Sequence, residues 1–109
     1  MDVKEINLGA IAGEKRVRNL SGKERGIAAR QKLGLDALDQ FPGEIAVIIP
    51  DFVDTISPSF FQGLFSQSIR ALHGKAAFLK KYHFVANDSI KRWIEIGVRN
   101  ASSSRDELI

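Results

Sequence analysis

Two serine hydroxyls, Ser57 and Ser59, stand two residues apart on either side of Pro58. An apolar run typical of a strand precedes them and an amphipathic pattern typical of a helix follows, so we expect them at a strand-to-helix turn. The first N–H groups of a helix are unpaired and its dipole is positive there, which makes this turn a seat for negative charge such as a phosphate. The alternative is that both serines only cap the helix.

A catalytic use of the same residues would make Ser59 a nucleophile with His73 or His83 as its base. A hydrolase elbow needs glycines around its serine, but Pro58 and Phe60 occupy those positions. The two histidines are ten residues apart without clustered carboxylates, and the chain has no cysteine. The sequence therefore predicts no enzyme, no metal site and no cofactor.

Charge is distributed unevenly along the chain, whose net charge is +3. Residues 14–32 carry seven basic and two acidic side chains, whereas residues 33–54 carry five acidic side chains and no basic one. The basic segment offers an alternative function, in which a small basic α/β domain binds nucleic acid through phosphate contacts. The residues that would make these contacts are Arg16, Arg18, Lys23 and Arg25. No recognised nucleic-acid-binding motif accompanies them, and charge runs are more often solvated faces.

The elements that position the serines surround residues 44–72. Residues 45–49 form an unbroken apolar run that Pro50 ends, which predicts a strand buried on both faces. Ser57 and Pro58 are typical of the cap and first turn of a helix. Apolar side chains then recur at spacings of three and four, at Phe61, Leu64, Phe65, Ile69 and Leu72. One face of this helix is expected to cover the sheet.

On the N-terminal side of this stretch, residues 3–8 predict a short strand, and residues 14–20 are compatible with either a loop or a strand. Ser21 and Glu24 have the spacing of a capping box, which predicts a helix from there to Gly34 and, after a kink, on to Phe41. Pro42 and Gly43 end that element.

On the C-terminal side, His73 and Gly74 predict a helix end with a glycine cap. Residues 82–86 predict a strand, and Asn87 with Asp88 predicts the start of a last helix, in which Trp93 is expected to lie in the core. Residues 101–109 contain three consecutive serines and are expected to form a flexible C-terminal tail after a single domain at 1–100.

Composition limits the class of protein. A chain of 109 residues, 44% of them apolar, has the size of one compact domain. Its longest apolar run is five residues, against about twenty for a membrane-spanning helix, so no membrane span is expected. The absence of cysteine is compatible with a reducing compartment, and the cytoplasm is the expected location. No feature of the sequence indicates an oligomeric state.

The apolar strand, the turn at residues 56–60 and the helix after it together resemble the STAS-like domains, relatives of bacterial anti-sigma factor antagonists. In the antagonists the turn reads Asp-Ser-Ser-Gly, and its second serine, which corresponds to Ser59 here, is phosphorylated by a partner kinase. Ser57 replaces the aspartate and Phe60 the glycine, which is more similar to the STAS-like branch of unknown function. In order of elements the resemblance spans about residues 20–98.

The resemblance implies an α/β fold, a small sandwich in which helices pack on a mixed β-sheet. It also implies a non-enzymatic module that binds another protein and is regulated by phosphorylation of Ser59. The docking surface would be the turn formed by Thr55, Ser57, Ser59 and Phe60. The implied partner is a histidine-kinase-like ATPase or a serine kinase, and nucleic acid is the second choice of partner.

Overall fold

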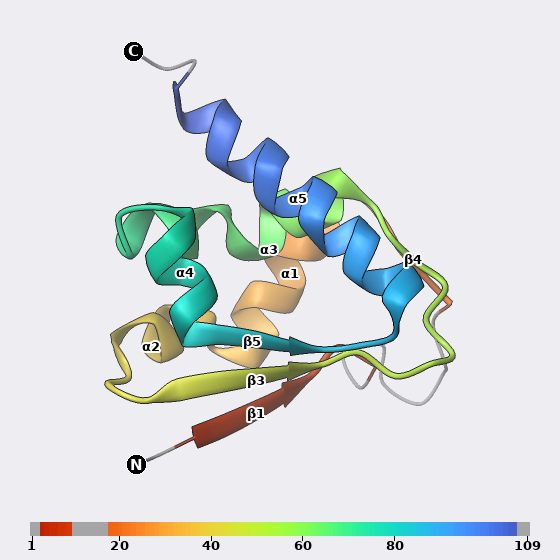
Figure 1. The fold of residues 1–109 in the computed structure, drawn as a ribbon, viewed down its shortest axis with the longest axis horizontal. Helices are drawn as coiled ribbons and strands as arrows, with labels where there is room; N and C mark the ends of the chain where they lie inside the picture. Colours follow the sequence, from red (N-terminus) through yellow and green to blue (C-terminus); the bar gives the residue numbers. More distant parts are fainter. Residues whose placement is uncertain (1–2, 10–17, 107–109) are drawn as a thin grey trace.

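The computed structural model describes residues 3–9 and 18–106, and the side chains of all of these except 103–106. Figure 1 shows helices packed above a small sheet, which confirms the α/β class. The strands are β1 (Val3–Asn7), β2 (Asn19–Leu20), β3 (Glu44–Ile48), β4 (Thr55–Ile56) and β5 (Tyr82–Val85). The helices are α1 (Lys23–Leu33), α2 (Leu35–Gln40), α3 (Pro58–Ala71), α4 (Lys75–Lys81) and α5 (Asp88–Asp106).

The main sheet has three strands in the order β1-β3-β5. Both pairings are parallel, with Ile6 opposite Val47 and Val47 opposite Phe84. The strands that pair are joined through helices, as parallel neighbours require. The expected mixed sheet is therefore wrong for the described strands, all of which pair in parallel.

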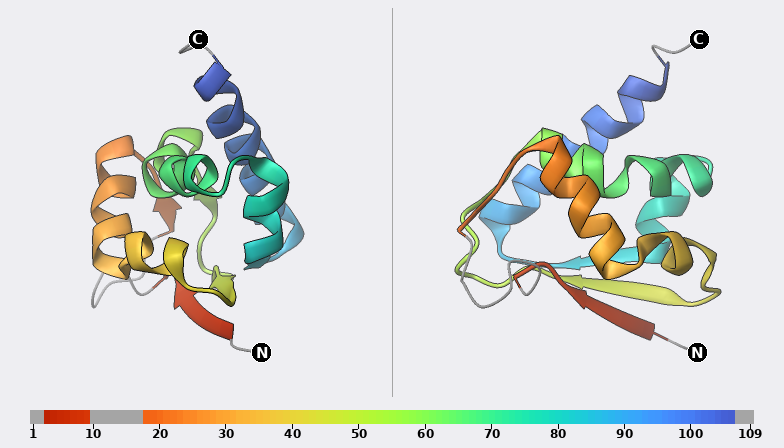
Figure 2. Two further views of the ribbon diagram at one scale, coloured as in Figure 1. Left: turned by 90° about the vertical axis from the view of Figure 1, so that its left-hand side faces the viewer. Right: turned by 180° about the vertical axis from the view of Figure 1, so that it is seen from behind.

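Helices cover only one face of this sheet in the described part of the chain, as both views in Figure 2 show. Along β3 and the residue after it, Ile45, Val47 and Ile49 are buried, whereas Ala46 and Ile48 between them are only partly buried. The prediction of a strand buried on both faces is therefore wrong. The continuous apolar run resembled a central strand of a doubly covered sheet, but the structure uses only alternate residues for the core.

A second, two-stranded sheet pairs β2 with β4 in parallel, with Leu20 opposite Ile56. The ladder extends into the turn after it, where the Ser57 N–H donates to the Leu20 carbonyl at 2.8 Å. Each strand is followed within three residues by a helix, α1 after β2 and α3 after β4. This short ladder therefore places the N-termini of α1 and α3 side by side. The sequence left residues 14–20 open between loop and strand, and it did not predict β4.

Helix α1 begins differently from the prediction. Its N-terminal cap is Gly22, with φ of 93°, and no side chain caps it, so the capping box predicted at Ser21 does not form. The expected kink is confirmed at Gly34, whose left-handed conformation (φ 69°) ends α1 and starts α2. A residue without a β-carbon adopts this conformation without steric cost.

Helix α3 begins and ends close to the predicted residues, but its last cap differs. The His73 N–H donates to the Arg70 carbonyl and the Gly74 N–H to the Ile69 carbonyl, which is the Schellman pattern. His73 rather than Gly74 adopts the left-handed conformation, with φ of 68°. Gly74 instead caps α4, a helix that the sequence did not predict.

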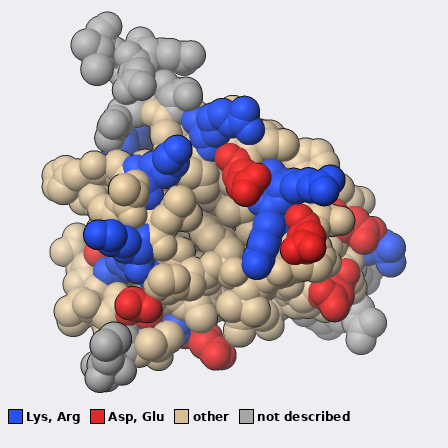
Figure 3. All heavy atoms as spheres, in the orientation of Figure 1, with Lys and Arg blue, Asp and Glu red and all other residues tan. Residues whose placement is uncertain are grey.

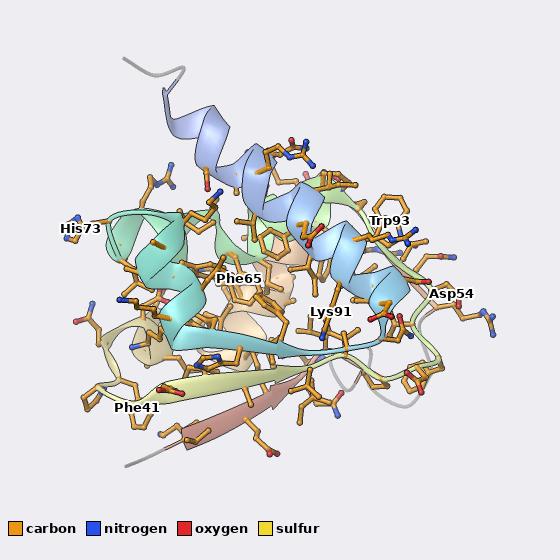
Figure 4. The ribbon with its side chains drawn as sticks, viewed as in Figure 1. Phe41, Asp54, Phe65, His73, Lys91 and Trp93 are labelled. Carbon is orange, nitrogen blue, oxygen red and sulfur yellow. The ribbon has the colours of Figure 1, made fainter. Side chains whose placement is uncertain are left out.

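Replacing His73 by glycine is expected to raise the free energy of unfolding by about 1 kcal/mol, because a β-carbon in the left-handed region is strained. His73 is exposed and points away from the body of the protein, so the loss of its imidazole should matter little (Figure 4). Urea denaturation measures the change. The matched control is His73→Ala, which removes the imidazole but keeps the β-carbon. An equal gain in both variants would show that the backbone at this position is not strained.

The core lies between α3 and the covered face of the sheet. Five aromatic rings contact one another there, and the Phe65 ring lies 5.2 Å from Phe61, 5.2 Å from Phe78 and 5.3 Å from Tyr82 between centroids. Phe84 completes the cluster at 5.7 Å from Phe65. Figure 4 shows Phe65 pointing into the space between the helices and the sheet. Helix α3 is thus the central element that its apolar stripe predicted.

Helix α5 packs across α3 and begins as expected, with the Asn87 side chain accepting from the Ile90 N–H at 2.9 Å. Trp93 packs against the core and is partly buried, as predicted. The expected flexible tail is wrong for residues 101–106, because α5 continues to Asp106 and Ala101 is buried. Residues 107–109 lie outside the described part. Within residues 3–9 and 18–106, no helix combines the length and apolar character needed to cross a membrane.

Candidate functional site

The turn between β4 and α3 has the local structure that its sequence predicts. Ser57 is the N-terminal cap of α3, and its hydroxyl oxygen accepts a hydrogen bond from the Phe60 N–H at 3.1 Å. Pro58 occupies the first helical position, where its missing N–H leaves no hydrogen bond unmade. The Ser57 hydroxyl therefore has a structural role.

Ser59 differs from Ser57 in its environment. It is exposed in the first turn of α3, and its hydroxyl oxygen lies 3.1 Å from that of Ser57. No acidic residue lies in this first turn. The side chain can therefore be reached from solvent, and a negative charge on it would face the positive end of the α3 dipole.

The other two residues of the predicted docking turn, Thr55 and Phe60, point elsewhere. The Thr55 hydroxyl donates to the Asn19 side-chain oxygen at 2.7 Å, so this half-buried side chain links β4 to β2. Phe60 is only 2% exposed and belongs to the core. The prediction that Phe60 belongs to the docking surface is therefore wrong. Its position in the first turn of the helix did not by itself show whether the side chain faces the core or solvent.

The residues proposed for phosphate contact are only partly brought together. The Arg18 guanidinium pairs with the Asp54 carboxylate at 2.8 Å, so the basic segment meets the acidic one across the β2–β4 ladder. Lys23 and Arg25 are exposed on α1, and Arg16 lies outside the described residues. Among the three described candidates, Arg18 is thus paired with a carboxylate, whereas Lys23 and Arg25 form no ion pair.

Neither histidine lies near Ser59. His73 follows the opposite end of α3, which is about 20 Å long at 1.5 Å per residue. His83 lies on the uncovered face of the sheet, where its Nε2 is 2.8 Å from a carboxylate oxygen of Glu44. The nucleophile and base of the catalytic alternative are thus not assembled. Residues 3–9 and 18–106 also contain no cluster of three or more possible metal ligands.

The sequence did not predict a buried polar network that lies below α1 and α3. Arg30 is 6% exposed, and its guanidinium is surrounded by acceptors. Its Nη2 donates to Asp39 at 2.6 Å and to Asp36 at 2.8 Å, and its Nε donates to Asp36 at 3.0 Å. Its Nη1 donates to the Leu64 carbonyl at 3.0 Å and to the Ser68 hydroxyl at 2.9 Å. All five guanidinium donors therefore have acceptors.

The same network reaches β5 through Asp39. The Tyr82 hydroxyl donates to the second carboxylate oxygen of Asp39 at 2.5 Å, and Lys81 donates to the carbonyls of Asp39 and Phe41. Burial raises the pKa of the Tyr82 hydroxyl far above its usual range, and the hydrogen bond to Asp39 adds to the rise. The network connects α1, α2, α3 and β5, so it holds the helical layer in register with the sheet.

One sequence signal could have indicated this network. Ser68 lies within the apolar stripe of α3, between Leu64 and Ile69, and it is fully buried. A polar residue on a buried face needs a partner. The sequence alone did not identify Arg30 as that partner, because Arg30 lies in a basic segment whose charges are expected to face solvent.

Comparison of the chain with protein-family models, with curated proteins and with solved structures gave no match.

Proposed function

We propose that this chain is a STAS-like, non-enzymatic module that binds another protein and is switched by phosphorylation of Ser59. The observation that carries the proposal is that the two serines of this turn have different environments. Ser57 caps α3 through its hydroxyl, whereas the Ser59 side chain is exposed in the first turn of α3. Ser59 can therefore be modified without loss of the cap.

The STAS-like part of the proposal rests on the order of the elements and on the turn. The parallel strands alternate with helices, and residues 56–60 lead from the short strand β4 into the central amphipathic helix. By this resemblance the partner is a histidine-kinase-like ATPase or a serine kinase. The cytoplasm is the compartment in which such partners act.

The electrostatics of the turn favour a switch that leaves the fold intact. A phosphate on Ser59 would add about −1.5 to −2 charges at pH 7. The positive end of the α3 dipole is close to it, and the N-terminus of α1 lies alongside. Asp54, directly before β4, is partly neutralised by Arg18. The added charge should therefore leave the domain folded and should change the binding of a partner at this turn.

Ser59→Asp is expected to lose the partner that copurifies with the wild-type protein from its native host, because the new charge repels an acidic or apolar partner surface. Ser59→Ala should keep the partner and should lose phosphoserine at this site. Mass spectrometry measures both the partner and the modification. Circular dichroism should be the same for all three proteins, since the side chain is exposed.

The chain offers a matched control in Ser89. It is exposed and occupies the same position of α5, two residues after the cap Asn87, that Ser59 occupies after Ser57 in α3. Ser89→Asp therefore adds the same charge at the same helical position elsewhere and should leave the partner bound. Equal recovery of the partner by Ser59→Asp and wild type would rule out the switch.

A further inference from the structure

A groove with a volume of about 350 Å³ runs between α1 and α3. The two helices cross each other, and α1 lies in front of α3 in the right-hand view of Figure 2. Side chains from both helices line the groove, among them Lys23, Ile27, Gln62, Ser66, Gln67 and Arg70. Arg70 follows Gln62 by eight positions on the helix, a rise of about 12 Å, or two turns.

The groove is positively charged. None of the described residues that line it carries a carboxylate, whereas three are cationic. Arg30 is one of these, but all its donors are used in the buried network. Lys23 and Arg70 are exposed, and neither forms an ion pair within the described part of the chain. These two cations are therefore available to a ligand.

An apolar side chain lies between the charged ones on α1. Ile27 follows Lys23 by one helical turn, lines the groove and is 42% exposed. The face that carries α4 and α5 differs from this groove in its charge. Figure 3 shows lysine and arginine intermixed with aspartate and glutamate over the face that carries α4 and α5. The groove between those two helices has Glu95 among its lining residues beside Lys75 and Arg99.

We propose that the α1–α3 groove binds an acidic amphipathic helix of a partner protein. Two carboxylates about two turns apart on the partner would pair with Lys23 and Arg70, and an apolar side chain between them would cover Ile27. Helices commonly bind to grooves between helices in this way, through anchors spaced by whole turns. This assignment rests on the proposed function, in that it locates the docking surface and gives the chemistry of the partner.

The proposed phosphorylation site lies at one end of the same groove. Ser59, Gln62, Ser66 and Arg70 are spaced by three, four and four residues, so they share one face of α3. A dianion on Ser59 would lie at the Lys23 end of the groove. There it would repel the carboxylates of the bound helix. The groove thus explains why a charge on Ser59 would weaken docking rather than folding.

The test uses NMR of the labelled full chain titrated with a synthetic amphipathic helix that has leucine on one face and glutamate on the other. We expect saturable shifts confined to amides around the groove, and none with a lysine version or a scrambled sequence of the same composition. The charge reversals Lys23→Glu and Arg70→Glu should each weaken binding about tenfold, since each replaces an attraction by a repulsion. The matched controls Lys91→Glu and Arg92→Glu change exposed residues of α5 and should not weaken it.

A second matched pair tests the apolar contact. Ile27→Ala should weaken binding of the glutamate peptide, whereas Leu79→Ala, at 41% exposure beside the α4–α5 groove, should not. The absence of saturable shifts, or equal effects of each variant and its control, would overturn the proposal. So would tighter binding of a single-stranded oligonucleotide to the same residues, which would assign the groove to nucleic acid.

The outcomes separate this inference from the proposed function. If the groove variants lose the peptide but Ser59→Asp binds it as well as wild type, the groove stands and the switch fails. If Ser59→Asp releases the native partner while Lys23→Glu and Arg70→Glu retain it, the switch stands and the assignment of the groove is wrong.

Discussion

Replacing Arg30 by methionine is expected to lower the free energy of unfolding by about 3–5 kcal/mol, because it leaves a buried carboxylate without its cation. The Asp39 side chain is only 4% exposed and lies 2.6 Å from the guanidinium. The Leu64 carbonyl and the Ser68 hydroxyl would lose a donor as well. Urea denaturation followed by circular dichroism measures the loss.

Asp36 provides the matched control for the buried pair. It accepts from the same guanidinium, but its side chain is 85% exposed, so Asp36→Ala should cost about 1 kcal/mol or less. Asp39→Leu combined with Arg30→Met should recover part of the stability, since it removes both buried charges together but also takes the acceptor from the buried Tyr82 hydroxyl. A loss for Arg30→Met no larger than that for Asp36→Ala would show that the network does not hold the helices.

Replacing Gly63 by alanine is expected to destabilise the protein by about 3 kcal/mol, at the upper end of the usual cost of overpacking. A β-carbon at Gly63 would overlap the carbonyl oxygen of Lys23 and lie 2.9 Å from the Ile27 nitrogen. These are backbone atoms, so no side-chain rotation can relieve the overlap. Helix propensity alone predicts the opposite, a gain of about 1 kcal/mol for alanine in a helix interior.

Gly26 is the counterpart of Gly63 on α1, since a β-carbon there would overlap the Phe60 carbonyl oxygen. Gly26→Ala should have a similar effect, and the double variant should cost less than the sum, because either β-carbon already forces the two helices apart. Gln67→Ala is the control. It lies one turn after Gly63 on an exposed position and should change stability by less than about 0.5 kcal/mol. A stabilising Gly63→Ala would contradict the close crossing of α1 and α3.

Local sequence was sufficient where neighbouring residues decide the structure. Ser57 and Pro58 specify a helix start through a capping hydroxyl and a fixed φ, and both act as predicted. The apolar spacing of α3 and the alternation in β5 likewise indicated which side chains face the core. Ser21 shows the limit of such signals. A capping box forms only if the serine itself occupies the N-cap position, and in this structure Gly22 occupies it.

The α/β class, the central role of α3 and the position of Ser59 at a helix start were thus determined by the sequence itself, through signals a few residues long. Tertiary structure alone decided that Phe60 turns inward, that Arg30 is buried and that the described helices cover only one face of the sheet. The groove belongs to this second group. Lys23 and Arg70 are 47 positions apart in the sequence, and they line one surface only because the β2–β4 ladder and the Gly26–Gly63 contact bring α1 against α3. No local pattern encodes such a pairing, since it depends on where two distant backbones can approach without a β-carbon between them.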